Sequence, residues 1–182
     1  MGSSLWLMLL FQAVLVGLNA VFACAEIAVI SMDEKRIADL AERGDKRAGR
    51  LLALTGEPAK CLGTIQVAVT LSGFMGSAFA ADNFSDSLVD FLLGLGLCIP
   101  KSTLDTIVVV GITLVLSYFT LVFGELVPKR AAMKNADELA LKVSGLLHGI
   151  SIAFAPVVWF LTLSTNAVLK LMGVDTEEKK AD

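Results

Sequence analysis

The sequence predicts an all-α membrane protein, and three observations support that fold class. Hydrophobic residues make up 55% of the 182 residues, charged residues make up only 18%, and the mean hydropathy is +0.75. Long runs without any charge recur along the chain, and a strongly charged segment separates the first run from the second. About 20 apolar residues in a helix cross the roughly 30 Å hydrocarbon layer of a bilayer, so each long run is a candidate span. The uncharged runs cover residues 3–25, 61–81, 106–124 and 143–169.

The first run predicts a transmembrane helix over about residues 5–32. A signal peptide is the other interpretation of an apolar run at this place in a chain. A signal peptide begins with positive charge and has a shorter apolar stretch, whereas here no Lys or Arg precedes Lys35. We therefore expect this helix to remain in the mature protein.

Segment 33–60 is rich in both signs of charge. Its apolar residues recur at nearly helical spacing, which predicts a short helical hairpin against the membrane surface over about residues 33–58. A plain solvated loop is the alternative. Gly44 and Gly49 are positions at which the helix could break, and Gly56–Pro58 is typical of a helix end. The apolar positions are Ile37, Leu40, Ala41, Ala48, Leu51, Leu52 and Leu54.

The second and third spans are expected over about residues 60–81 and 104–128. The segment between them, residues 82–105, contains one lysine and four aspartates. It includes an apolar stretch that is expected to lie in the interface, because it is too short to cross the bilayer.

Orientation follows from the positive charges, because cytoplasmic flanks of spans collect Lys and Arg. Segment 33–60 carries seven of them and Lys129–Arg130 follows the third span, so both are predicted to lie inside the cell. The acidic segment 82–105 is then outside. This places the N-terminus outside as well.

The fourth uncharged run is open to two interpretations. Hydropathy alone favours a fourth span. However, Pro156 lies in its middle and Gly145 and Gly149 loosen it, so a bent helix along the inner interface is the alternative. A span would leave the C-terminus outside, and an interfacial helix would leave it inside.

Several classes of function find no support in the sequence. The net charge of −3 and the pI near 5.2 give no basic surface for nucleic acid. The single histidine, His148, belongs to no recognisable catalytic set, and no phosphate-binding or HExxH motif occurs, so we expect no enzyme. The three cysteines lack metal-site spacing and are interpreted as small hydrophobic residues: Cys24, Cys61 and Cys98.

What remains is a small set of polar residues inside the spans. An ionisable group in a span costs at least about 2.5–3.5 kcal/mol on insertion scales, and it normally faces the bundle interior or a water-filled cavity. Residues three or four positions apart share a helix face. The positions that share a face are Asn19, Ala23 and Glu26 in the first span and Gln66, Thr70 and Gly73 in the second. The third span offers Ser117, Thr120, Gly124 and Glu125.

The stretch FGELVPKR, residues 123–130, predicts a cation site. Pro128 has no amide hydrogen, so the carbonyl of Gly124, four residues earlier, loses its donor beside the Glu125 carboxylate. Oxygen ligands of this kind suit a hard cation such as Mg²⁺, and Asn19 and Thr70 could supply neutral oxygens. The alternative is that Glu125 reaches the interface and Pro128 only marks the end of the span.

Glu26 also has more than one interpretation. It could bind the ion, accept a hydrogen bond behind the ligands, or pair with a cation inside the protein. Gln66 and Ser72 are more often interhelical hydrogen-bonding residues than ligands.

Four motifs together resemble the transmembrane domain of the CNNM/CorC family, whose bacterial members are often labelled hemolysin-like. They are LNAVFACAEIAVIS, the charged RIADLAERGDKRA, TIQVAVTLSG and LVFGELVPKR, of which GELVPK is the most specific. The resemblance covers essentially the whole chain. It implies a homodimer of three-span protomers in the cell (inner) membrane. The fourth run then belongs to juxtamembrane helices over about residues 135–172, including a belt helix, and the C-terminus is cytoplasmic.

The resemblance also implies magnesium transport, with sodium as a possible counter-ion and a dehydrated Mg²⁺ in each protomer. Full-length relatives continue into a cytosolic pair of CBS modules that bind ATP, and because this chain stops at Asp182 we expect a membrane domain without that part. The expected metal positions are Glu125, Gly124, Asn19, Thr70 and Ala23, supported by Glu26, Gln66, Ser72 and Thr120, with Pro128 as helix breaker. Relatives often have paired serines where this sequence has Asn19 and Ala23, and a glycine–asparagine pair in the second span where it reads Ala68, Val69 and Thr70.

Two further functions stay open at this point. In a scaffolding or regulatory membrane protein, the polar groups would only hold the helices together and a cytosolic part would sense nucleotide. A cation channel is an intermediate possibility between scaffold and exchanger.

Overall fold

The computed structural model describes residues 2–95 and 100–173, and every regular element in these two ranges is helical, as predicted. In chain order the helices are α1 (Gly2–Ser31), α2 (Glu34–Glu42), α3 (Lys46–Thr55), α4 (Pro58–Gly94), α5 (Lys101–Leu121), the π-helical turn η1 (Val122–Leu126), α6 (Val127–Ala132), the 3₁₀ turn η2 (Met133–Asn135), α7 (Ala136–Ala153) and α8 (Ala155–Leu171).

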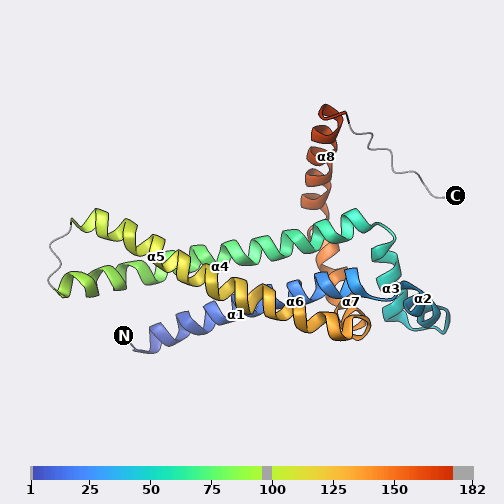
Figure 1. The fold of residues 1–182 in the computed structure, drawn as a ribbon, viewed down its shortest axis with the longest axis horizontal. Helices are drawn as coiled ribbons and strands as arrows, with labels where there is room; N and C mark the ends of the chain where they lie inside the picture. The colour runs from blue at the N-terminus through green and yellow to red at the C-terminus, as the bar shows by residue number, and fades with distance from the viewer. Residues whose placement is uncertain (1, 96–99, 174–182) are drawn as a thin grey trace.

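Three long helical runs form the body of the molecule (Figure 1). α4 packs along both α1 and α5, and α1 also contacts η1 and α6. The start of α1, the end of α4 and the start of α5 lie at one end of the bundle, and α2 and α3 lie at the other. Within the described residues, three helices are long and apolar enough to cross a membrane, and they lie in Trp6–Ser31, Pro58–Gly94 and the helical run Lys101–Ala153.

The outward faces of the bundle are apolar. Trp6, Leu114 and Tyr118 are all more than 60% exposed on the single chain. In water such faces would be costly, but a helix that is hydrophobic all round suits a membrane. The chain is therefore an integral membrane protein.

α4 is longer than the predicted second span. Residues 82–94, expected to belong to an outer loop lying in the interface, continue the helix instead. The reason is packing: Val89 is fully buried against Leu104 and Val108 of α5, with Leu92 and Leu93 beside them. The apolar stretch thus closes a helical hairpin with α5, which corrects the sequence-based expectation.

The predicted hairpin between the first two spans is present as α2 and α3. Asp33 caps α2 by accepting hydrogen bonds from the backbone N–H groups of Lys35 and Arg36. The chain turns at Gly44, whose φ of +90° favours glycine. The other candidate breaker, Gly49, lies inside α3.

Each helix of this hairpin points its apolar face at the bundle. Ile37 and Leu51 are fully buried against Ala28 of α1 and Ala140 of α7. The hairpin is therefore a packed element of the fold.

At the start of α3, the hydrogen bond from the Arg47 side chain lowers the pKa of the capping Asp45 carboxyl.

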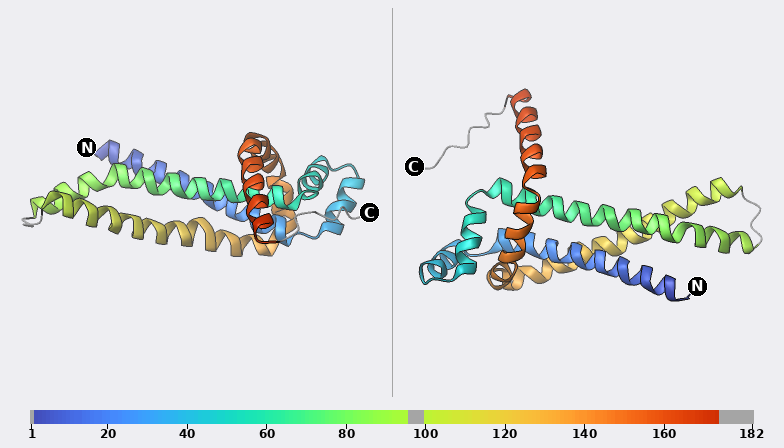
Figure 2. Two further views of the ribbon diagram at one scale, coloured as in Figure 1. Left: turned by 90° about the horizontal axis from the view of Figure 1, so that it is seen from above. Right: turned by 180° about the vertical axis from the view of Figure 1, so that it is seen from behind.

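The fourth uncharged run divides into α7 and α8 at Phe154. Pro156 lies in the first turn of α8, where its missing N–H costs no helical hydrogen bond. α7 packs against α1 and α3, whereas α8 projects sideways from the bundle (Figure 2). α8 is the shorter apolar helix, below the length of the three candidate spans.

The cysteines in the described part of the chain behave as small core residues. Cys61 is buried in a cluster with Phe22 and Ile65, and Cys24 is half-buried. Cys98 lies outside the described residues.

Candidate functional site

A break in the third long helix creates the candidate site. α5 passes into the π-helical turn η1, in which the N–H of Val127 donates to the carbonyl of Val122, five residues earlier. Pro128 follows in the first turn of α6 and has no N–H to give to the carbonyl of Gly124. Single π turns of this kind occur frequently at functional sites.

The freed carbonyl finds its donor on another helix. The Asn19 carboxamide of α1 donates from Nδ2 to the Gly124 carbonyl at 3.2 Å. Asn19 has no exposed surface, and its Oδ1 has no hydrogen-bond partner among the described residues. A cross-helix hydrogen bond therefore replaces the one that Pro128 cannot make.

Gly124 favours this approach. A Cβ built on Gly124 would lie 3.0 Å from Asn19 Nδ2 and 3.4 Å from Thr120 Cγ2, closer than ordinary contacts. The predicted supporting residue Thr120 therefore adjoins the site. A side chain at this position would require the Asn19 carboxamide to shift by a few tenths of an ångström, so glycine favours the close approach of α1 and η1.

Glu125 adds a carboxylate beside the Asn19–Gly124 hydrogen bond. Its Oε1 lies 3.5 Å from Asn19 Nδ2, at the long limit for a hydrogen bond, and the side chain is half-buried. One carboxylate, one backbone carbonyl and one carboxamide thus meet at the junction of α1 and η1. The predicted residues Asn19, Gly124 and Glu125 are brought together.

A second link joins α1 to α6 one to two turns further along. Lys129 Nζ lies 2.9 Å from Glu26 Oε2, and both side chains are more than two-thirds buried. Cys24 Sγ donates to the Pro128 carbonyl at 3.4 Å. Of the three interpretations of Glu26, the structure shows the internal ion pair.

The other predicted residues lie differently. Ala23 is fully buried on the face of α1 that carries Asn19 and Glu26. Ser72 donates to the Ala68 carbonyl within α4.

Thr70 and Gln66 are exposed and lie away from this junction, along a groove between α4 and α8. Gln66 Nε2 donates to Thr70 Oγ1 at 3.4 Å, and Phe74 and Leu161 line the same groove of about 310 Å³. The single chain therefore does not bring Thr70 to the Asn19–Glu125 junction.

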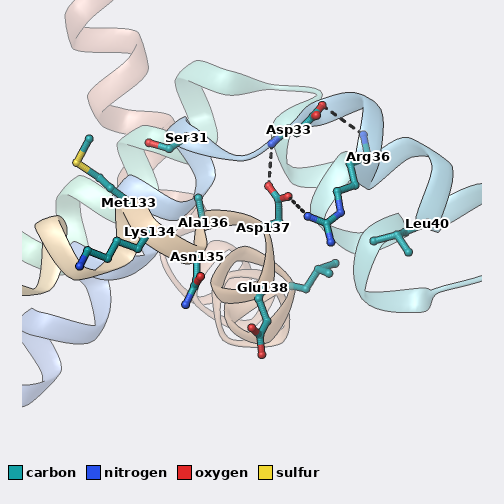
Figure 3. Close-up of a pocket in the computed structure, with 11 residues that line it drawn as sticks. Ser31, Asp33, Arg36, Leu40, Met133, Lys134, Asn135, Ala136, Asp137 and Glu138 are labelled. Carbon is teal, nitrogen blue, oxygen red and sulfur yellow. Dashed lines mark hydrogen bonds and ion pairs between the residues drawn. The ribbon is translucent and has the colours of Figure 1, made fainter.

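A larger pocket of about 610 Å³ lies at the hairpin end of the bundle (Figure 3). Asp137 spans it, pairing with Arg36 at 2.8 Å and accepting from the backbone N–H of Asp33 at 2.9 Å. Charges of both signs line the pocket, and Arg36 and Asp137 form an ion pair in it. The contacts of Asp137 with Arg36 and Asp33 join α2 to α7.

The chemistry of the Asn19–Glu125 junction suits a cation. In residues 2–95 and 100–173 no group of three or more His, Cys, Asp or Glu side chains is placed to hold a metal. An ion at this junction would therefore rely on one carboxylate and neutral oxygens, which are ligands for hard cations.

Two features of the site were missed by sequence reasoning. Nothing in the sequence assigned Lys129 as the partner of Glu26, because the two residues lie on different helices and are 103 positions apart. The π turn was also unforeseen, although Gly124 and Pro128 four residues apart mark where it forms.

Comparison with known proteins agrees with this architecture. The family model of the cyclin M transmembrane N-terminal domain matches residues 10–182. The UPF0053 protein sll0260 of Synechocystis is 36% identical over 178 residues, which is 97% of this chain and 39% of that protein.

Two further relatives are more distant. The polyamine export protein of Haemophilus influenzae is 26% identical over 162 residues, covering 87% of this chain and 36% of its own length. The UPF0053 inner membrane protein YfjD of Escherichia coli is 24% identical over 160 residues, covering 88% and 34%. The chain therefore spans less than two-fifths of the length of each of these three relatives.

Gly124→Ala should destabilise the junction. The new Cβ would push the Asn19 carboxamide from the Gly124 carbonyl, and overpacking of this kind costs about 1–3 kcal/mol. The melting temperature of the purified protein in detergent should fall. Gly111→Ala is the matched control, because a Cβ there meets nothing within 4 Å. Equal melting temperatures for the two variants would contradict the tight approach of Asn19.

Removing one partner of the Glu26–Lys129 pair should cost more than removing both. Glu26→Gln or Lys129→Met alone leaves a partly buried charge uncompensated, whereas the double variant leaves none. A double-mutant cycle on thermal stability should give a coupling of about 0.5–3 kcal/mol. The exposed pair Glu138–Lys142 is the control and should give nearly none. Additive effects at Glu26 and Lys129 would refute the pairing.

Proposed function

The chain belongs to the cyclin M transmembrane N-terminal domain family, and from this premise we propose that it is the membrane domain of a magnesium transporter. The observation that carries the proposal is the meeting of the Glu125 carboxylate, the Gly124 carbonyl and the Asn19 carboxamide at the π turn. Export coupled to sodium entry is the form of transport that we propose, with Mg²⁺ as the cargo and Na⁺ as the counter-ion.

The Asn19 side chain is suited to exchange a hydrogen bond for an ion. Its Nδ2 group, which carries partial positive charge, now lies against the same two oxygens that a cation would use. Turning the carboxamide over would present Oδ1, which is buried and has no partner among the described residues. Three oxygens would then face the ion from α1 and η1.

Three protein oxygens are fewer than the six that Mg²⁺ prefers. Water or further protein groups would supply the rest, and Thr70 and the backbone beside Ala23 are the predicted candidates. Thr70 lies in the groove against α8, so a movement of α4 would be needed to bring it in. Alternating access of this kind is the proposed mechanism.

The expected assembly is a homodimer in the cell membrane, with the N-terminus outside and the C-terminus in the cytoplasm. α8 supports a juxtamembrane position, because it is apolar, short and directed sideways from the bundle (Figure 1). ATP would act only through cytosolic modules of the longer protein.

A scaffold without transport is the second candidate. Its support is the internal pairing of polar groups, namely Asn19 with Gly124 and Glu26 with Lys129, which can hold helices together without any ion. A scaffold of this kind would bind no Mg²⁺ at the junction. Ion titration therefore separates the two candidates.

Glu125→Gln should abolish saturable Mg²⁺ binding, because among the described residues it removes the one carboxylate at the junction while keeping the size of the side chain. Isothermal titration calorimetry on the purified chain measures this, with Ca²⁺, Na⁺ and a polyamine as competitors because one relative is named for polyamine export. Glu138→Gln, on the exposed start of α7, is the matched control. Binding by Glu125→Gln equal to wild type would reject the site, and a wild-type chain without binding would favour the scaffold.

Pro128→Ala should weaken Mg²⁺ binding. An alanine restores an N–H that can donate to the Gly124 carbonyl and so compete with the ion. Affinity should fall by about twofold to twelvefold, because the net contribution of a hydrogen bond is about 0.5–1.5 kcal/mol. Pro156→Ala, at the start of α8, provides the control titration. An affinity unchanged by Pro128→Ala would mean that the freed carbonyl is not a ligand.

A further inference from the structure

Lys129 is a cation that lies one helical turn beyond the proposed ion site. It follows Glu125 by four residues in one continuous helical run, from η1 into α6. Its Nζ lies 2.9 Å from Glu26 Oε2 of α1, and its side chain is 29% exposed. In the described part of the chain, no lysine or arginine pairs with Glu125. The Lys129 ammonium is thus placed on Glu26, although a second carboxylate lies one turn away on its own helix.

The local helix favours that second carboxylate. Residues four apart on a helix have Cβ atoms about 5–6 Å apart, and a glutamate that precedes a lysine by four residues is the better orientation of such a pair. Long side chains on a helix also lean back toward its N-terminus, over the preceding turn. The stem of Lys129 is therefore suited to place its ammonium beside Glu125. The position of α1 draws the ammonium to Glu26 instead.

The contact with Glu26 is one that the ammonium can exchange. Glu26 Oε2 is buried and makes no hydrogen bond among the described residues, although Lys129 Nζ lies 2.9 Å away. The two groups are therefore held by charge, without the directional geometry of a hydrogen bond. A lysine carries its compact charge on a flexible stem of four carbons. The ammonium can thus change its carboxylate by rotation of the side chain.

Given the proposed cation transport, on which this inference rests, we propose that Lys129 is a tethered competitor of the transported cation. Glu26 is the positioning residue that holds it away from Glu125. While Lys129 lies on Glu26, the Glu125 carboxylate is available to the ion. When Lys129 moves to Glu125, its ammonium neutralises the carboxylate and displaces the ion. A charged group inside a span is costly without a partner, so the exchange stabilises Glu125 once the cargo has left.

Glu26→Gln should weaken Mg²⁺ binding, because Glu125 then becomes the carboxylate within reach of Lys129. The affinity measured by calorimetry should fall by at least about fivefold, the lower end of typical couplings between sites. Adding Lys129→Met removes the competitor and should restore the wild-type affinity. Lys129→Met alone should bind Mg²⁺ at least as tightly as the wild type, whereas a pair that only holds the helices together predicts weaker binding.

Arg130→Met is the matched control for the loss of a positive charge. Arg130 is the next residue in the chain and is exposed. Its removal should leave the Mg²⁺ affinity nearly unchanged, because an exposed charge is screened by solvent. An affinity raised equally by Arg130→Met and Lys129→Met would reduce the effect to net charge and overturn the proposal.

Carbodiimide coupling shows directly which carboxylate Lys129 contacts, because the reagent joins a carboxylate to an amine without a spacer. With the membrane-soluble dicyclohexylcarbodiimide and Mg²⁺, the wild-type chain should link Lys129 to Glu26. Glu26→Gln without Mg²⁺ should link Lys129 to Glu125, and Mg²⁺ should suppress that link. Mass spectrometry of the digested protein separates the two products, since the first joins two peptides and the second closes a ring within one.

Three results would overturn the proposal: no Lys129–Glu125 link in Glu26→Gln, a link there that Mg²⁺ does not suppress, or an Mg²⁺ affinity of Glu26→Gln equal to the wild type. Glu26→Asp is the second variant if Glu26→Gln does not fold. It keeps the charge on a shorter side chain, so it should also produce the Lys129–Glu125 link, and its absence would count equally against the proposal.

Failure of this inference can be distinguished from failure of the proposed function. Mg²⁺ binding that depends on Glu125 but is unchanged by Glu26→Gln rejects only the competition by Lys129. Absence of Mg²⁺ binding in the wild-type chain, together with coupling products that do not respond to Mg²⁺, rejects both.

Discussion

Inside a membrane every backbone N–H and C=O group must find its partner within the protein, and this constraint shapes the candidate site. Pro128 removes one donor from the third long helix, and Gly124, whose carbonyl loses that donor, is buried in the protein. The helix forms a π turn at this point, and the Asn19 carboxamide of α1 donates a hydrogen bond to the Gly124 carbonyl. The position of α1 against η1 therefore depends on the N–H group that Pro128 lacks.

Two polar links of different kinds hold α1 beside this π turn. The Asn19–Gly124 hydrogen bond joins neutral groups, and the Glu26–Lys129 pair joins charged groups that are more than two-thirds buried. Both links lie on one face of α1, where apolar packing alone would not set the rotation of the helix, since lipid is as apolar as the protein core. The polar contacts thus define the register in which Glu125 meets Asn19.

Local sequence signals predicted the local structure well. Alternation of charge and apolar residues indicated the α2–α3 hairpin, Gly44 marked its turn, and Pro156 marked the division between α7 and α8. The sequence failed where a segment had two possible environments. Residues 82–94 resemble an interfacial loop in composition, but Val89 packs on α5 and keeps them helical. Periodicity placed Thr70 and Gln66 on one face without showing that this face meets α8.

By itself the sequence determined that the chain is a membrane protein and that Gly124, Glu125 and Pro128 form a helix break with an acidic group, because length, apolarity and the lack of an N–H are local properties. It could not determine which side chain would satisfy the freed carbonyl, or that Lys129 would pair with Glu26. Residues 19 and 124, like residues 26 and 129, are more than a hundred positions apart. Only the tertiary structure decides such pairings, because they depend on how α1 is rotated and shifted against the broken helix.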